Sequence, residues 1–458
     1  MNSSLNDNSY YILGLDVGSI NTTAVVAKVD ETGVSICGVG KNQTSGLKKG
    51  VITNIEKAAF SIKNATKEAI RSAGKNPDKI IVSIAGAYTH SVKSQGIVSV
   101  LSGEITIGEI KRAMQLAQDN AVVGKDRAIL HVLPYSFKVD GQDHIEDPIG
   151  MCGSRLEVFT HVVTADENSV RNLIKATKLA GLEIDNMVLS GYASAISTLT
   201  KEEKELGVGL IDMGGATCDI VIHLGNSIIY NESLPVGSSN ITMDLSKALN
   251  TPLANAEELK TNYSKLLEED TKELRIPTMG ENSSTHTASM DIVIKVVYAR
   301  IEETILLLYK QLESSGYLNR LGAGLVVTGG LAKIDNDIRN IISMAFGNIP
   351  VRLAKPKEIG GLYEICNDSE YSCVIGLCLY GAGHFTRYEI DSNGHLKYLD
   401  NKKIDFEKSI SSNNQEEYKN ENSETKDDET SVKLTQTLRD VNDISAFKKF
   451  INRLKQIF

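Results

Sequence analysis

Two stretches of this chain repeat one pattern: an apolar strand, a turn containing aspartate and glycine, and a second apolar strand. The first is YYILGLDVGSINTTAVVAKVD (residues 10–30), and the second is GVGLIDMGGATCDIVIHLGNSIIY (207–230). Their aspartates, Asp16 and Asp212, lie 212 − 16 = 196 residues apart. That spacing is typical of a duplicated domain rather than of a short solenoid repeat. A third stretch, GAGLVVTGGLAKIDN (322–336), predicts a strand, a T-G-G turn and the start of a helix.

Helical patterns separate these strand patterns. Residues 55–74 and 168–182 place apolar side chains at positions i, i+3 and i+4, which is typical of helices with one buried face. Strands that alternate with such helices indicate an α/β body. The chain is therefore expected to fold as two similar α/β halves, each with a glycine turn.

Two further segments resemble insertions into these halves. Residues 87–164 contain a capping-box signature, Thr106 to Glu109, ahead of a helical pattern, and then two strand patterns at 128–140 and 155–165. Residues 240–321 are expected to be mostly helical, with helices in 255–270 and 290–314. The polar run TMGENSSTHTAS (278–289) between these helices is expected to be a loop.

The apolar pattern stops after GLCLYGAGHF (376–385). Residues 391–442 are rich in Asn, Ser, Glu and Lys and cannot bury enough apolar surface to offset their ordering entropy, so we expect a disordered linker. The last segment, 443–458, forms an amphipathic helix on a wheel, with its apolar residues in an arc of roughly 140°. The apolar residues are Ile444, Phe447, Phe450, Ile451, Leu454, Ile457 and Phe458, and the basic residues at its borders are Lys448, Lys449, Arg453 and Lys455.

This pattern favours a helix that lies flat in a membrane interface, with its lysines extended towards anionic headgroups. The alternative is a helix that docks on its own folded body or in the groove of a partner protein. The formal net charge of −9 gives no general attraction to anionic lipid or to nucleic acid, so such a membrane contact must be local, and we expect no nucleic-acid partner. Six cysteines without a CxxC pattern indicate reduced thiols.

The N-terminus has no basic region ahead of its apolar run, so we expect no signal peptide. No apolar run reaches the ~18 residues needed to span a bilayer.

The glycine turns suit phosphate. Glycine lets backbone N–H groups approach an anion, and successive N–H groups form a concave anion site. Asp16 and Asp212 would face the same pocket, and carboxylates tolerate phosphates nearby only if a cation such as hydrated Mg²⁺ lies between them. Ser19 and Thr217 would add hydroxyl groups, and Gly329 with Gly330 would let the third turn press against a nucleoside.

The motifs D-V-G-S, D-M-G-G-A-T and V-V-T-G-G-L-A resemble the phosphate and adenosine motifs of the actin, Hsp70 and sugar-kinase superfamily. Over residues 10–390 the chain resembles more closely the FtsA family of bacterial cell division. The resemblance is carried by ILHVLPYSFKVDG, DPIGMCGSRLEV, LSGYASAISTLTKEEKELGVGLIDMGGATCDI and LPVGSSNITMDLS. It implies an α/β fold of duplicated actin-like (ribonuclease H-like) domains with an inserted subdomain, a disordered linker and a C-terminal amphipathic helix.

The resemblance also implies where the domains lie. The first half would comprise 10–86 and 165–204, with 377–390 returning to it, and the inserted α/β subdomain would be 87–164. The second half would comprise 205–239 and 322–376, and a helical insertion over the nucleotide would be 240–321. The linker would be 391–442, and the membrane-targeting helix would be 443–458.

The implied ligands are ATP and Mg²⁺. The nucleotide-binding residues would be Asp16, Gly18, Ser19, Asp212, Gly214, Gly215, Thr217, Glu257, Lys260, Gly329 and Gly330, and Asp16 and Asp212 would hold Mg²⁺ through water. SINTTA (19–24) lacks the lysine that many superfamily members carry there, and Gly191 and Tyr192 stand where Hsp70-type members have Glu-Pro. We therefore assign no catalytic residue and expect at most slow ATP hydrolysis.

The implied function is that of an ATP-binding adaptor which forms filaments with itself on the cytoplasmic face of the inner membrane at the division site. It would tether FtsZ, the tubulin-like division protein, to anionic lipid and recruit later division proteins. FtsZ would engage the second insertion, where ARIEE (299–303) could contribute; the alternative for ARIEE is an internal helix that packs on the nucleotide domain. The alternatives are a sugar- or acetate-type kinase, an Hsp70-like chaperone, and an actin-like scaffold of pilus assembly.

Overall fold

The computed structural model describes residues 9–225, 227–269, 271–280, 284–334 and 338–398. The predicted helix at 443–458 and most of the predicted linker therefore lie outside the described residues. Across the described part of the chain, no helix combines the length and the apolar character needed to cross a membrane.

The first half is built on a six-stranded sheet with the order β11-β6-β1-β2-β3-β19. β1, β2 and β3 form an antiparallel meander, and β6 and β11 extend the sheet in parallel with β1. The first glycine turn connects β1 to β2. The strands are β1 (Tyr10–Val17), β2 (Asn21–Asp30), β3 (Gly33–Gln43), β6 (Lys79–Ile84), β11 (Asn186–Leu189) and β19 (Gly360–Gly361).

The second half repeats this arrangement in a five-stranded sheet with the order β14-β13-β12-β17-β18. It corresponds strand for strand to β3-β2-β1-β6-β11, including the antiparallel meander and the two parallel strands. The strands are β12 (Val208–Met213), β13 (Cys218–Leu224), β14 (Ser227–Leu234), β17 (Leu325–Thr328) and β18 (Val351–Leu353). The common order confirms the duplicated fold predicted from the repeated pattern.

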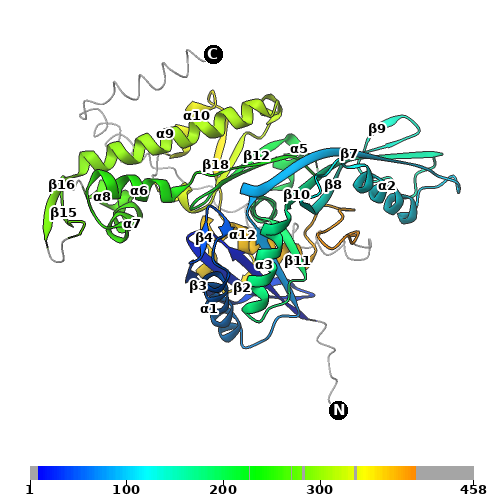
Figure 1. The fold of residues 1–458 in the computed structure, drawn as a ribbon. Helices are drawn as coiled ribbons and strands as arrows, with labels where there is room; N and C mark the ends of the chain where they lie inside the picture. Colours follow the sequence, from blue (N-terminus) through cyan, green and yellow to red (C-terminus); the bar gives the residue numbers. More distant parts are fainter. Residues whose placement is uncertain (1–8, 226, 270, 281–283, 335–337, 399–458) are drawn as a thin grey trace, which may run out of the picture. The chain divides into compact units, whose positions relative to one another are not determined.

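Helix α1 (Ile55–Ala73) covers one face of the first sheet against β2 and β3 (Figure 1). It begins where the Asn54 side chain accepts a hydrogen bond from Lys57 N–H, and it ends at Gly74 in the left-handed conformation. α3 (Glu167–Leu179) packs beside α1. The remaining helices of the two halves are α4 (Ser190–Thr198), α5 (Lys201–Leu206), α10 (Ile338–Ala345), α11 (Tyr363–Cys366) and α12 (Ser372–Ala382).

Helices α4 and α12 pack tightly against each other, and α12 also contacts β1 while α4 contacts β12 and β13. An added Cβ at Gly376 of α12 would lie 1.8 Å from the carbonyl oxygen of Ala193 in α4, so a larger residue cannot occupy this position. This helix pair therefore connects the first sheet to the second.

The inserted unit is a four-stranded antiparallel sheet, β7-β10-β8-β9, covered by α2 (Ile107–Asn120). The predicted capping box is present, because Thr106 and Glu109 bond each other's backbone N–H groups. β7 was not predicted from the sequence. The strands are β7 (Thr89–Ser99), β8 (Arg127–Val139), β9 (Gln142–Ile145) and β10 (Arg155–Asp166).

The second insertion contains α6 (Ser238–Ala248), α7 (Leu253–Thr261), α8 (Tyr263–Glu268) and α9 (Met290–Ser314). The polar run 278–289 is a loop only in part, because Thr285–Ser289 forms strand β16 and pairs with β15 (Glu273–Pro277). In β16, threonine and histidine alternate with a strand period but form no apolar run. The prediction of a loop, which was based on polarity, therefore missed this strand.

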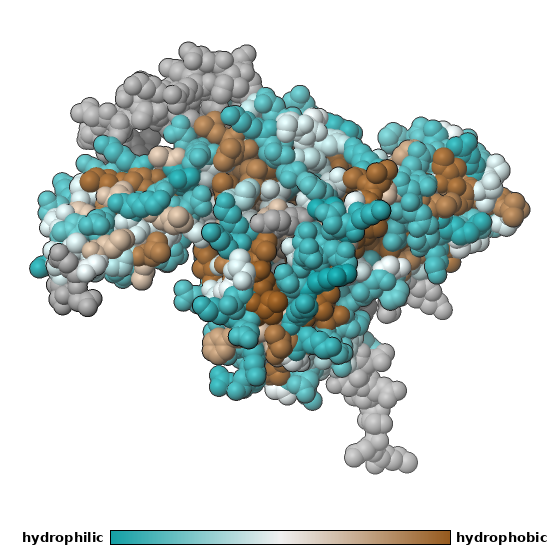
Figure 2. All heavy atoms as spheres, in the orientation of Figure 1, coloured by the Kyte–Doolittle hydropathy of each residue, from teal (hydrophilic) through white to brown (hydrophobic). Residues whose placement is uncertain are grey.

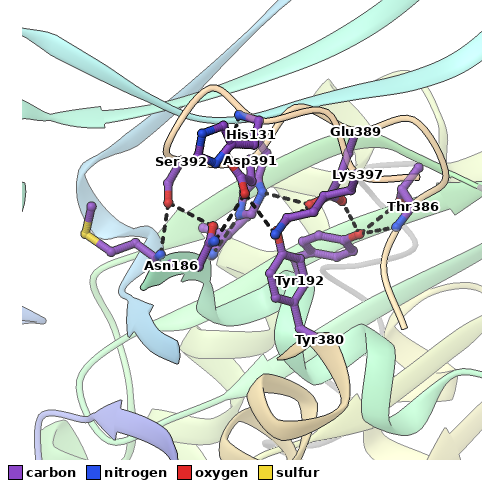
Figure 3. A network of polar contacts seen from close by, with 12 residues as sticks. His131, Asn186, Tyr192, Tyr380, Thr386, Glu389, Asp391, Ser392 and Lys397 are labelled. Atoms are coloured by element: carbon purple, nitrogen blue, oxygen red, sulfur yellow. Dashed lines mark hydrogen bonds and ion pairs between the residues drawn. The ribbon is translucent and has the colours of Figure 1, made fainter. Parts of the chain in front are cut away.

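The segment after α12, residues 386–398, lies on the folded body, and we call it the strap. Ile390 exchanges backbone hydrogen bonds of 2.9 and 3.0 Å with Val132 of β8. The linker predicted to begin at residue 391 is therefore wrong for 391–398. These residues contain few apolar side chains, but polar contacts hold them, as Figure 3 shows.

A two-stranded hairpin, β4 (Leu47–Lys48) and β5 (Val51–Ile52), follows β3. Short 3₁₀ turns complete the fold at Gly86–Tyr88, Leu318–Arg320, Gly330–Lys333 and Ser369–Tyr371. Hydrophilic residues cover most of the face shown in Figure 2, and the apolar residues there form separate patches.

Candidate functional site

The three glycine turns meet at one place. An added Cβ at Gly215 in the second turn would lie 2.5 Å from the side chain of Ile20, which follows Ser19 in the first turn. An added Cβ at Gly329 in the third turn would lie 2.4 Å from Asp212 Oδ1. Gly329 also has φ +91, which favours glycine. These two contacts leave no room for side chains at Gly215 and Gly329, so the three turns pack closely against each other.

The start of α6 lies on the second turn. The N–H groups of Ser238 and Ser239 donate to the carbonyls of Gly214 and Gly215, at 3.1 and 2.7 Å. Gly237 precedes them, and an added Cβ there would come within 2.6 Å of the Gly215 backbone. The N-terminus of a helix attracts anions, so α6 adds to the positive potential at this turn.

Glu257 and Lys260 lie on α7 beside the start of α6. Both were predicted to contact the nucleoside. Lys260 Nζ lies 2.7 Å from Glu257 Oε2 and 3.4 Å from Ser238 Oγ. Glu257 also accepts a hydrogen bond of 2.5 Å from Thr242 on α6. The fold thus brings this pair next to the second turn, although it is some forty residues distant in sequence.

Asp16 and Asp212 are half-buried, and each is held by a serine. Ser83 of β6 donates to Asp16 Oδ1 at 2.7 Å, and Ser194 of α4 donates to Asp212 Oδ2 at 2.5 Å. Burial raises the pKa of Asp16. Burial, together with repulsion from Asp219 and Asp16, raises the pKa of Asp212 to about 7.

A third carboxylate, Asp219, belongs to this cluster and was missed in the sequence analysis. It accepts hydrogen bonds of 2.5 Å from Ser190 and Ser233, and burial raises its pKa. Asp219 lies directly opposite Asp212 in the β12–β13 pair. Directly paired residues of antiparallel strands project on the same face. The hairpin register around the second turn could therefore have identified Asp219.

Backbone groups and the Ser19 hydroxyl shape the first and second turns. Gly214 N–H donates to the Thr217 carbonyl at 2.9 Å and closes the second turn. Within the described residues, the N–H groups of Gly215 and Ala216 have no hydrogen-bond acceptor. Ser19 Oγ accepts a hydrogen bond of 3.0 Å from Gly50 N–H, so this hydroxyl connects the first turn to the β4–β5 hairpin.

The carboxylates fit a hydrated divalent cation better than a fully protein-bound one. Buried carboxylates that repel one another are hard oxygen ligands for Mg²⁺, which usually keeps several waters and is completed by phosphate oxygens. The described part of the chain has no group of three or more His, Cys, Asp or Glu side chains arranged to hold a metal ion. The Mg²⁺ role expected for Asp16 and Asp212 stays a prediction.

Gly191 and Tyr192, which stand where Hsp70-type members have Glu-Pro, are enclosed by neighbouring side chains. Gly191 is the second residue of α4, and an added Cβ there would lie 2.8 Å from Val221 Cγ2 and 3.3 Å from Asp219 Cβ. Tyr192 is buried and donates its hydroxyl proton to Glu389 of the strap, at 2.7 Å. Neither position offers a base for an attacking water.

Comparison with protein families and curated proteins gives a consistent result. The family model described as "Cell division protein FtsA" matches residues 209–376, and that described as "SHS2 domain inserted in FTSA" matches 86–164. The Cell division protein FtsA of Helicobacter pylori is 38% identical over 420 residues, covering 84% of this chain and 85% of that protein. The chain belongs to the FtsA family. It is accordingly a cell-division protein with an actin-like fold.

Other relatives extend this comparison. The Cell division protein FtsA of Pseudomonas aeruginosa is 36% identical over 81% of this chain and 89% of that protein. Among solved structures, a chain of the "PilM-PilN type IV pilus biogenesis complex" superposes with a TM-score of 0.57 and 16% identity, covering 81% of this chain and 98% of that chain. That likeness concerns the fold alone. The range 86–164 begins one residue before the predicted inserted unit.

Proposed function

We propose that this FtsA-family chain binds Mg²⁺–ATP between its two halves, forms filaments on the cytoplasmic face of the inner membrane, and tethers FtsZ to that membrane. The observation that supports it best is the meeting of three glycine turns around buried, mutually repelling carboxylates. Such a cluster is stable only if something compensates its charge, and a hydrated cation carrying a nucleotide polyphosphate does so.

In this proposal the first and second turns bind the phosphates through Gly18, Ser19, Gly215 and Thr217. The third turn, at Gly329 and Gly330, lies along the nucleoside with Glu257 and Lys260 opposite. When bound, Mg²⁺ would neutralise phosphate charge, and Asp16 and Asp212 would orient its waters. A nucleotide that contacts both halves favours their closed arrangement, because it binds that arrangement more tightly.

The binding proposal is tested by isothermal titration of Mg²⁺–ATP into the Asp212→Ala protein. We expect affinity to fall at least tenfold, because the cation loses one of its two carboxylates. Asp119→Ala removes an exposed aspartate of α2 and should bind as the unaltered protein does. Equal affinities for all three proteins would show that the turns are purely structural.

Hydrolysis should be slow. Positions 191 and 192 offer no glutamate, and the packing of Gly191 against Val221 and Asp219 leaves no room for one. A phosphate-release assay should therefore show turnover well below the 1–10³ s⁻¹ range of typical enzymes. Turnover within that range would refute this part of the proposal.

The membrane part of the proposal rests on the sequence of residues 443–458. Its four basic residues add about 1 kcal/mol each near an anionic surface, before opposing costs, so one helix binds weakly and a filament of many binds strongly. Deletion of 443–458 should release the protein from anionic liposomes while Mg²⁺–ATP binding persists. A tail with the same composition in scrambled order is the control, since it keeps the charge and loses the apolar face.

Filament formation follows from head-to-tail contacts, which do not close on themselves and so continue indefinitely. ATP should increase the sedimentable fraction of the protein on anionic liposomes, and Asp212→Ala should abolish that increase. If the sedimentable fraction were the same with and without ATP, filament assembly would not depend on nucleotide binding.

FtsZ docking is proposed on the second insertion, where α6 and α9 border an open pocket lined by Asp244, Lys247, Ala248, Val296, Ala299, Arg300 and Glu303. Arg300 is held there by Asp244 at 2.5 Å, so ARIEE contributes to this pocket rather than to the nucleotide site. Lys247→Glu should reduce co-sedimentation of FtsZ with liposome-bound protein. Lys310→Glu, on an exposed position of α9 outside the pocket, is the matched control. Later division proteins would be recruited by the assembled filament.

A further inference from the structure

The tip of the β4–β5 hairpin has an unusual backbone for its sequence. Lys49 has φ +50 and Gly50 has φ +78, so two successive residues are left-handed, as in a type I′ turn. Asparagine and glycine are the residues that adopt this turn at low cost. A lysine at the first of these positions is disfavoured, and such outliers cluster at functional sites.

This tip lies at both phosphate turns. Gly50 N–H donates to Ser19 Oγ of the first turn, at 3.0 Å. An added Cβ at Gly50 would lie 2.8 Å from Ala85 Cβ and 3.8 Å from Thr217 Cγ2 of the second turn. The hairpin therefore holds Lys49 beside the two turns that belong to different halves of the molecule.

The site beside it carries an excess of negative charge. Asp219 is buried and interacts electrostatically with the half-buried Asp16 and Asp212, and within the described residues no ion pair joins any of the three to a lysine or arginine. Lys260 is engaged by Glu257 on the nucleoside side. A polyphosphate adds further negative charge, which one Mg²⁺ compensates only in part.

The side chains of Lys48 and Lys49 are exposed and make no ion pair or hydrogen bond in the described part of the chain. The Lys49 Cα lies about 2.4 Å from Gly50 N by standard backbone geometry, and hence within about 5.5 Å of Ser19 Oγ. A lysine side chain of five bonds extends roughly 6 Å from its Cα. Its ammonium group can therefore reach an anion held over the first turn.

We propose that Lys49 supplies the cation which contacts the terminal phosphates, with Lys48 adding positive potential beside it. This replaces, from a separate hairpin, the lysine that is missing after the first turn in SINTTA. The inference rests on the proposed nucleotide function and adds a phosphate ligand to it. Because the tip contacts both Ser19 and Thr217, phosphates bound by Lys49 would also fix the hairpin between the two halves.

The test compares binding of Mg²⁺–ATP, Mg²⁺–ADP and AMP by titration calorimetry. Lys49→Gln should weaken Mg²⁺–ATP binding about tenfold or more, and Lys48→Gln about two- to threefold, while AMP affinity stays unchanged. Lys49→Arg should retain most of the affinity. Lys63→Gln combined with Lys67→Gln, on the exposed side of α1, matches the charge change of the double hairpin variant and should have no effect.

A second variant excludes a loss of folding as the cause. Lys49→Asn suits the left-handed position, so its thermal midpoint should equal or exceed that of the unaltered protein, while its Mg²⁺–ATP affinity falls like that of Lys49→Gln. If the unaltered protein binds no Mg²⁺–ATP, the proposed nucleotide function fails. If it binds and the Lys48→Gln, Lys49→Gln double variant binds equally well, only the assignment of the lysines is overturned.

Discussion

The molecule contains two buried clusters of carboxylates that differ in how their charge is balanced. Where the three glycine turns meet, Asp212 faces Asp219 and Asp16, accepts a hydrogen bond from a neutral serine, and has a pKa raised to about 7. Under the strap, Asp391 lies 2.9 Å from Lys397 Nζ. Burial opposes ionisation there too, but hydrogen bonds from Lys397, His395 N–H and Asn186 lower the pKa of Asp391.

The strap cluster also contains Glu389, which is fully buried (Figure 3). Tyr380 donates to Glu389 Oε1 at 2.6 Å, and Tyr192 donates to Oε2 at 2.7 Å. His131 Nδ1 lies 3.7 Å from Oε1, while Nε2 of the same ring accepts Leu189 N–H at 3.2 Å. The two donors thus come from α4 and α12, and His131 of β8 lies beside them without a hydrogen bond from Nδ1. A carboxylate satisfied by its own chain indicates a structural role, whereas carboxylates left to repel one another indicate a site for a ligand.

The largest effect is expected at the strap. Glu389→Ala leaves two buried tyrosine hydroxyls without their acceptor and should reduce the free energy of unfolding by about 3–5 kcal/mol. Urea denaturation followed by circular dichroism measures this change. Glu183→Ala, at an exposed glutamate, should change it by less than about 0.5 kcal/mol. Similar stabilities for both variants would show that the strap does not hold the body together.

At Asp212, by contrast, removal of the carboxylate is expected to stabilise the nucleotide-free protein near neutral pH. The folded-state pKa of Asp212 is about 7 against an ordinary value of 3.8, so the folded protein binds this proton more tightly than the unfolded chain. Without nucleotide, stability should therefore fall as pH rises from about 4 to about 7, by at most roughly 4 kcal/mol from this group. Asp212→Asn should make that decline shallower and should stabilise the nucleotide-free protein near neutral pH.

The measurement is urea denaturation at several pH values, with Asp119→Asn as the control at an exposed site. The prediction would be contradicted if the free energy of unfolding changed with pH equally in Asp212→Asn and in the unaltered protein. Saturating Mg²⁺–ATP should remove the difference in slope, because a bound cation compensates the ionised carboxylate.

The smallest effect concerns Lys397, which is partly exposed. Lys397→Met keeps an apolar side chain over the rings of Tyr380 and Phe385 and removes the charge. The free energy of unfolding should therefore fall by about 0.2–1 kcal/mol near neutral pH. The lowered pKa of Asp391 means that its contribution is present above pH 3.8 and is lost as pH falls through the folded-state pKa. The two proteins should therefore become equally stable in acid, and a difference that persists there would exclude the ion pair as its source.

Much of the fold could be predicted from sequence, because local patterns specify it. The repeated strand–turn–strand pattern predicted the duplicated sheets, and the Thr106–Glu109 signature predicted the start of α2. β7 and β16 were missed because their strand periodicity is carried by polar residues rather than by an apolar run. The strap was missed for the same reason, since polar contacts with distant elements hold it.

The site was predicted in part for a related reason. Asp16, Asp212 and Gly329 stand in turns that can be recognised locally, and the structure brings those turns together. Asp219 required the register of a hairpin, and Ser83 and Ser194 required contacts between elements far apart in sequence. Side chains that complete a site from a second element leave no local pattern to recognise.

The strap also determines where mechanical load would enter the protein. Residue 398 is followed by the chain that leads to 443–458, so tension on a membrane-bound tail would first reach residues 386–398. From there it passes into β8 through the Val132–Ile390 bonds, and into α4 and α12 through Tyr192 and Tyr380. In the proposed function, a pull from the membrane would thus be shared between the inserted unit and the helix pair that connects the two halves.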